Sequence, residues 1–150
     1  MNYKSLFISA LIIMSLGTLK AEENWSTDYA AAKTLATKTG KSILLDFTGS
    51  DWCMYCKKLE DEVFATPQFH DFSKDYILVR LDYPRTIKLT DAEHKQNDQL
   101  KSLFLIEGYP TVIVLDSKGV ELKRQVGYEP GSGPVAFLSG LVETSATKIK

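Results

Sequence analysis

Residues 44–58 have the sequence LLDFTGSDWCMYCKK and contain the only two cysteines of the 150-residue chain, Cys53 and Cys56. A short apolar run precedes them, so the pair is expected to follow a buried strand and to open a helix. With two residues between the cysteines, the second sulfur can reach the first within one helical turn. Unpaired N–H groups and the helix dipole would then stabilise a thiolate at Cys53. The spacing predicts a redox-active Cys-Met-Tyr-Cys dithiol in which Cys53 attacks and Cys56 resolves the mixed disulfide.

Four other uses of such a pair fit the sequence less well. A structural zinc site needs two more ligands, and the chain offers only His70 and His94, in no ligand-pair spacing. A c-type haem needs a histidine directly after the second cysteine, where this chain has Lys57. A purely structural disulfide would close too small a loop to constrain the unfolded chain much. Binding of Cu(I) by the two thiolates is an alternative, although no Met or His stands at a helpful spacing around them.

Two segments of the chain resemble the thioredoxin family. Asp46-Phe47 followed by Trp52-Cys53-x-x-Cys56-Lys57 is similar to the active-site segment of thioredoxins, and residues 108–114, GYPTVIV, are similar to the loop and strand that carry the cis-proline. The likeness covers approximately residues 25–149, and residues 47–53 look more like exported bacterial thioredoxin-like proteins than like cytosolic thioredoxins. The resemblance implies an α/β thioredoxin fold, with a central mixed β-sheet flanked by helices on both faces. It also implies a thiol–disulfide oxidoreductase that needs no cofactor beyond its own disulfide.

The resemblance implies a substrate groove beside the dithiol. Pro110 would form a cis peptide bond there, and the backbone next to it would pair with an extended segment of the substrate. Tyr109 would line the groove. Trp52 would pack beside the dithiol and limit the access of water. Trp52, Tyr109 and Pro110 are therefore the expected substrate-binding residues.

Asp46 is the third expected catalytic residue. A carboxylate in an apolar strand is costly unless it is paired, hydrated or protonated. In thioredoxins the corresponding aspartate lies beneath the disulfide and accepts the proton of the resolving cysteine, here Cys56. This chain has one residue more than the usual spacing between Asp46 and Cys53. The alternative is therefore that Asp51, near the mouth of the site, affects the thiols instead.

Residues 1–21 are predicted to be a secretory signal peptide. Lys4 precedes an uncharged apolar run over residues 6–16, and Ala21 is a small residue before the expected cleavage point. The run is shorter than the about 20 residues that a bilayer-spanning helix needs. Residues 22–150 would then form a thioredoxin-like domain in the periplasm or outside the cell, where disulfides persist. Membrane contact is expected only if the signal segment is retained.

Composition limits the range of partners. The chain has 18 basic and 19 acidic residues, for a net charge of −1, and loss of the first 21 residues would remove two lysines and leave −3. This mild acidic balance predicts no nucleic-acid partner. The expected partners are protein thiols and disulfides, together with an upstream protein that donates or accepts electrons. The length fits one domain, which we expect to be a monomer.

The hydrophobic pattern predicts alternating helices and strands. A first helix is expected to be capped by Ser26 or Thr27 and to end at Gly40. A polar helix is expected over residues 91–105, with Leu100, Leu103 and Phe104 as its apolar stripe. The other expected elements are strands over residues 42–48 and 76–83, helices over 53–65 and 66–72, a loop over 84–90, a hairpin over 111–126 and a last helix over 134–147.

The dipeptide Met54-Tyr55 leaves the direction of electron flow open. It has neither the Gly-Pro of cytosolic thioredoxins nor the Pro-His of strongly oxidising family members. The reduction potential depends on how far the reduced thiolate is stabilised, which this dipeptide influences. The first hypothesis is a reductase or exchange enzyme for envelope proteins. A disulfide oxidant or isomerase is the second, and a non-catalytic copper- or zinc-binding protein is the third.

Overall fold

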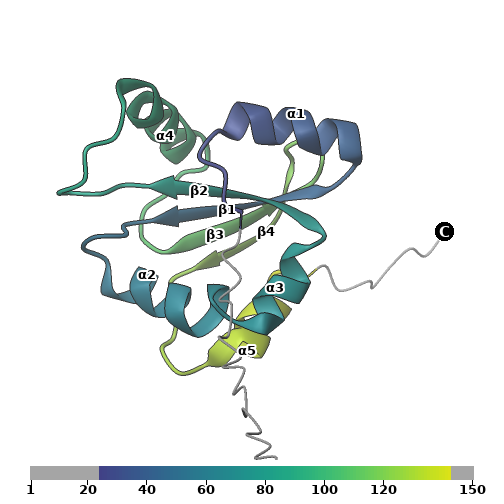
Figure 1. The fold of residues 1–150 in the computed structure, drawn as a ribbon, viewed down its shortest axis with the longest axis vertical. Coiled ribbons are helices and arrows are strands. Elements are labelled where there is room, and N and C mark those ends of the chain that lie inside the picture. The colour runs from purple at the N-terminus through teal and green to yellow at the C-terminus, as the bar shows by residue number, and fades with distance from the viewer. Residues whose placement is uncertain (1–23, 143–150) are drawn as a thin grey trace, which may run out of the picture.

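The computed structural model describes residues 24–142 and contains one mixed sheet of four strands in the order β2-β1-β3-β4 (Figure 1). The strands are β1 (Ser42–Thr48), β2 (Tyr76–Asp82), β3 (Thr111–Leu115) and β4 (Glu121–Val126). Strand β1 pairs parallel with β2 and antiparallel with β3, which pairs antiparallel with β4. β1 is therefore a central strand with a neighbour on each side, which fits its almost uniformly buried side chains.

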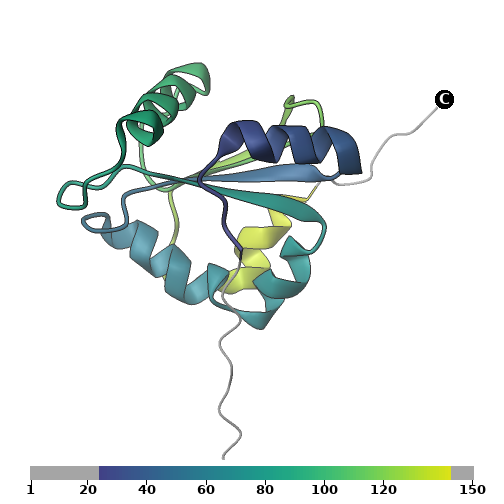
Figure 2. The same cartoon turned by 45° about the horizontal axis from the view of Figure 1, so that its top comes forward.

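Helices cover both faces of this sheet (Figure 2). On one face lie α1 (Tyr29–Thr39) and α4 (Asp91–Leu103). On the other lie α2 (Met54–Leu59), the π-helix η1 (Glu60–Phe64), α3 (Pro67–Ser73) and α5 (Gly133–Ser139). The predicted α/β architecture, a mixed sheet between two helical layers, is confirmed.

Two hydrophobic cores lie on opposite faces of the sheet. Because side chains alternate along a strand, Leu45 and Phe47 of β1 belong to the core that includes Ala36 of α1, whereas Leu44 belongs to the other core. In that second core Phe69 is fully buried and stacks on Trp25, with ring centroids 5.9 Å apart. The same alternation places the side chain of Asp46 on the α2 side of the sheet.

The start of α1 differs from the sequence prediction. Asp28, not Ser26 or Thr27, caps the helix, because its Oδ1 accepts the N–H of Ala31 at 2.9 Å. Ser26 instead pairs with the edge of β2, donating its N–H to the Leu78 carbonyl at 2.9 Å. Gly40, with φ of 75°, ends the helix as predicted.

Three other helix predictions need correction. The helix expected over residues 53–65 is divided into α2 and the π-helix η1. Helix α4 ends at Leu103, which is 68% exposed rather than part of the apolar stripe, and the buried Ile106 follows it. Helix α5 ends at Ser139, where the N–H of Gly140 turns back to the Phe137 carbonyl. Residues 143–147 of the predicted last helix lie outside the described residues.

Strand β4 forms one edge of the sheet. Its register against β3 shifts between Val114 and Leu115. Arg124 of β4 pairs with Glu121 on the same strand at 2.7 Å and donates to the Phe104 carbonyl at 2.8 Å. This edge is therefore irregular and carries charged side chains.

The N-terminal prediction falls outside this structure. Residues 1–21, the expected signal peptide, are not among the described residues. Between residues 24 and 142, none of the helices combines the length and the apolar character that crossing a bilayer requires.

Candidate active site

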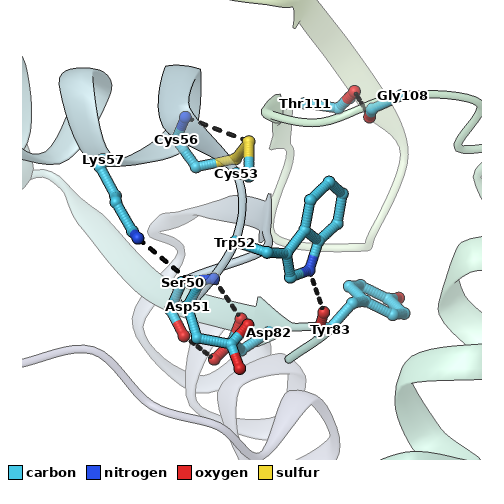
Figure 3. The surroundings of a disulfide bond; sticks show 10 residues. All are labelled: Ser50, Asp51, Trp52, Cys53, Cys56, Lys57, Asp82, Tyr83, Gly108 and Thr111. Atoms are coloured by element: carbon cyan, nitrogen blue, oxygen red, sulfur yellow. Dashed lines mark hydrogen bonds between the residues drawn. A yellow bond between two sulfur atoms is a disulfide. The ribbon is translucent and has the colours of Figure 1, made fainter. Parts of the chain in front are cut away.

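The two cysteines lie at the N-terminal end of α2 and form a disulfide with a Cα–Cα distance of 5.2 Å (Figure 3). Cys53 is the N-cap residue, and its sulfur accepts the N–H of Cys56 at 3.2 Å. A helix-terminal N–H therefore points at the sulfur of Cys53, as the spacing predicted. Both cysteines are only 5% exposed, whereas Met54 and Tyr55 between them are 70% and 53% exposed. The dipeptide side chains project into solvent while the cysteines are largely covered.

The additional residue between Asp46 and Cys53 is accommodated in a tight turn. The carbonyl of Gly49 accepts the N–H of Cys53 at 2.8 Å and that of Trp52 at 3.3 Å. A Cβ on Gly49 would lie 2.5 Å from the Trp52 indole, so only glycine allows the ring to pack against this turn. The indole Nε1 donates in turn to the Tyr83 carbonyl at 2.8 Å, which fixes the ring next to the dithiol.

The expected substrate-binding residues come together on one side of the dithiol. The rings of Trp52 and Tyr109 meet edge to face, with centroids 5.8 Å apart, and Tyr83 lies 5.1 Å from Tyr109. The peptide bond between Tyr109 and Pro110 is cis. Thr111 closes the loop that carries both residues by donating its hydroxyl to the Gly108 carbonyl at 2.8 Å (Figure 3). We call the rings of Trp52, Tyr83 and Tyr109 the aromatic cluster.

Asp46 is buried in the centre of the sheet. It lies opposite Arg80 of β2 and Val112 of β3, and it is 2% exposed. Its Oδ2 accepts a hydrogen bond from Arg80 Nε at 3.3 Å, while Oδ1 has no hydrogen-bond partner among the described residues. Burial raises the pKa of Asp46 to about 7, against the opposing effect of the Arg80 charge. The extra residue in the following loop has not moved this carboxyl out of the sheet.

Arg80 links Asp46 to a second acid. Its guanidinium also donates to Glu60 of η1 and lies 4.4 Å from the ring centroid of Trp25. Arg80, Glu60 and Cys56 line the same cavity, of about 460 Å³. Our sequence reasoning missed Arg80 and Glu60. An arginine within an otherwise apolar strand was the available signal, because such a charge needs a buried partner.

Asp51 has a different role from the one considered for it. Its carboxylate accepts the N–H groups of Arg85 at 3.0 Å and Thr86 at 2.6 Å, and also the Thr86 hydroxyl. These hydrogen bonds hold the pKa of Asp51 well below its usual range. Asp51 therefore stays ionised and anchors the loop over residues 84–90 to the active-site turn.

The two histidines lie away from the dithiol chemistry. His70 is exposed on α3, and His94 on α4 places its Nδ1 3.1 Å from Asp98. Across residues 24–142, no three side chains of His, Cys, Asp or Glu are grouped closely enough to hold a metal ion. Within these residues, a metal bound at the dithiol would therefore have two sulfur ligands and no third His, Cys, Asp or Glu side chain grouped with them.

Comparisons with known proteins agree with this geometry. Residues 24–117 match a family model described as thioredoxin-like. The chain is 33% identical over 131 residues to the disulfide bond reductase DsbH of Chlamydia pneumoniae, covering 87% of this chain and 76% of that protein. It is 31% identical over 157 residues to the thioredoxin-related protein DsbJ of the same organism, of which it spans 45%.

A solved structure supports the same assignment. The DsbH oxidoreductase superposes with a TM-score of 0.72 at 31% identity, over 87% of this chain and 90% of that one. The matched family model covers the segment in which Cys53 and Cys56 form their disulfide at the start of a helix. This chain belongs to the thioredoxin-like family and is a thiol–disulfide oxidoreductase.

Proposed function

We propose that this protein is an exported disulfide reductase for proteins of the bacterial envelope. The observation that carries the proposal is the placement of Cys53 as the N-cap of α2, with Cys56 at disulfide distance in the same turn. A helix-terminal cysteine has a stabilised thiolate, which is the form that attacks disulfides. The name of the Chlamydia relative, a disulfide bond reductase, supports the reductive direction.

The reaction proceeds in two exchanges. The Cys53 thiolate attacks one sulfur of the substrate disulfide, so that a Cys53–substrate bond forms and the other substrate sulfur leaves as a thiolate and takes a proton. Cys56 then loses its proton and attacks the Cys53 sulfur, which releases the second substrate thiol. Two electrons pass to the substrate, and the protein is left with the Cys53–Cys56 disulfide.

Asp46 is proposed to accept the proton of Cys56. Its raised pKa supports this role, because a carboxyl with a pKa of about 7 can exchange a proton near neutral pH. The cavity shared by Cys56, Glu60 and Arg80 leads from the resolving cysteine to the arginine that holds Asp46. Arg80 acts here as a positioning residue for the carboxyl.

The substrate is proposed to bind as an extended segment along the aromatic cluster. Trp52 is covalently next to Cys53 and touches Tyr109, so a segment lying along the two rings would have its disulfide beside the attacking sulfur. The backbone around Tyr109 and Pro110 would pair with this segment.

Export is proposed to follow from residues 1–21, with cleavage after Ala21. The mature domain would then work in the periplasm or outside the cell as a monomer and would need an electron-donating partner protein to regenerate its dithiol. In a compartment where disulfides persist, a reductase without such a donor would turn over only once.

The reduction potential of the Cys53–Cys56 couple tests the proposal. We would equilibrate the purified mature domain with glutathione and dithiothreitol buffers and quantify the oxidised fraction. A value near the thioredoxin end, roughly −270 mV, is expected for a reductase. A value near −120 mV would instead identify a disulfide donor. Failure to form the disulfide across this range would reject both and favour metal binding by the two thiolates.

Trapping of substrates provides the second test. The Cys56→Ser variant is expected to accumulate mixed disulfides with its substrates, because nothing then resolves the bond on Cys53. The Cys53→Ser variant is the matched control and should trap none. Equal trapping by the two variants would contradict the assignment of Cys53 as the attacking residue.

A further inference from the structure

Two cations stand over the rings of the aromatic cluster. The Arg85 guanidinium lies 4.0 Å from the centroid of Trp52. The Lys101 ammonium lies 5.5 Å from Tyr109 and 5.7 Å from Tyr83. Arg85 belongs to the loop over residues 84–90 and Lys101 to α4, so two separate segments place positive charge at the aromatic cluster. We call Arg85 and Lys101 the basic rim.

No acidic side chain among the described residues forms an ion pair with the side chains of the basic rim, and the nearby Asp51 carboxylate binds the backbone amides of Arg85 and Thr86. Within residues 24–142, neither Arg85 nor Lys101 makes an ion pair, although Arg80, Arg124, Lys58 and Lys74 all do. The side chains of Arg85, over Trp52, and Lys101, over Tyr83 and Tyr109, are therefore available to an acidic ligand that lies along these rings.

The backbone that carries Arg85 is held in place before any partner arrives. The Asp51 carboxylate binds the N–H groups of residues 85–87 and the Thr86 hydroxyl, and Asp51 is only two residues from Cys53. The Arg85 side chain is left to lie over Trp52. Because the loop is already ordered, binding a partner through this cation loses less conformational entropy than binding through a cation on a free loop.

We propose that the preferred substrates of this reductase carry acidic residues beside their disulfide, which Arg85 and Lys101 engage as the disulfide reaches Cys53. The inference rests on the proposed reductase function and specifies its substrate class. Charged groups at the rim of an interface act mainly on the encounter rate and on the choice of partner. The redox step itself is unchanged, because neither cation takes part in the exchange between sulfurs.

Three synthetic peptides test this inference. Each has the same intramolecular disulfide, flanked by glutamates, glutamines or lysines. Second-order rate constants are measured with pre-reduced protein in single turnover, by acid quench and mass spectrometry. At low salt we expect the glutamate peptide to react about tenfold faster than the lysine peptide. This ratio should fall towards one when about 0.5 M salt screens the charges.

Charge-reversal variants identify the residues responsible. The double variant Arg85→Glu/Lys101→Glu should lose or invert the ratio of the glutamate-peptide rate to the lysine-peptide rate at low salt. Lys118→Glu is the matched control, because Lys118 lies in the β3–β4 turn at the opposite end of the sheet, and it should keep the preference. Circular dichroism checks that each variant is folded.

The outcomes separate the inference from the function on which it rests. Equal wild-type rates with all three peptides at low salt, or a preference that survives the double reversal in a folded variant, would overturn the acidic-substrate proposal and leave the reductase intact. A wild-type protein that reduces none of the peptides would overturn both.

Discussion

Replacing Asp46 with asparagine should stabilise the oxidised protein at neutral and alkaline pH but not in acid. The unfolded chain ionises Asp46 near 3.8, whereas burial in the folded state keeps the proton on up to a pH of about 7. Between these values the unfolded state binds fewer protons, so the wild type loses stability as the pH rises. Roughly three pH units at about 1.36 kcal/mol each give a penalty of about 4 kcal/mol above pH 7. The neutral amide of the Asp46→Asn variant removes this penalty, because it has no proton to lose.

Urea unfolding from pH 4 to 9 measures the effect. The oxidised forms are compared so that the cysteines do not titrate. The free energy of unfolding of the variant should rise steadily relative to that of the wild type between pH 4 and 7, and the difference should then stay constant. The exposed Asp75→Asn serves as the control and should track the wild type throughout. A stability difference independent of pH would refute the assignment of a raised pKa to Asp46, and so would a carboxyl resonance that titrates near 4.

Three further changes follow from the same structure. Phe69→Ala removes a fully buried ring that stacks on Trp25, and it should lower the free energy of unfolding in urea titrations by about 3–5 kcal/mol. A loss under about 1 kcal/mol would contradict this packing. Gly49→Ala places a methyl group against the Trp52 indole and should lower the free energy of unfolding by about 1–3 kcal/mol. We also expect a shifted tryptophan emission and slower peptide reduction. An unchanged emission would show that the indole is not confined. Asp51→Asn weakens the hydrogen bonds that hold the loop over residues 84–90, so the amides of Arg85 and Thr86 should exchange hydrogen several-fold faster. The amides of β1 should exchange at the wild-type rate. Unchanged exchange at Arg85 and Thr86 would mean that the loop is held by other contacts.

The sequence was sufficient for the parts of the fold that depend on local pattern. The apolar run of β1 and the helix after Cys53 could be predicted because hydrophobic spacing and helix-terminal chemistry are both local. The cap of α1 was predicted wrongly for a non-local reason. Ser26 is a good cap by type, but it pairs with Leu78 in β2, so Asp28 caps the helix instead. The exposed Leu103 illustrates the same limit, because the chain leaves α4 there and Ile106 fills the core instead.

The dithiol could be predicted from spacing alone, but the environment of Asp46 could not. Its partner Arg80 lies 34 residues away, and the second acid on that arginine, Glu60, belongs to a helix on the same face of the sheet. The role of Asp51 was equally hidden, since the amides that it binds come from a loop 34 residues later. Contacts of this kind depend on strand pairing and loop geometry, which no local pattern encodes.

The two outer strands of the sheet bear on how this protein avoids aggregation. An exposed strand edge offers unpaired N–H and C=O groups to any other extended chain. Here Ser26 occupies part of the open side of β2, and the shifted register and charged side chains of β4 make the other side a poor template. An enzyme that binds extended substrate segments along its aromatic cluster, as proposed here, would thus have sheet edges that discourage intermolecular strand addition.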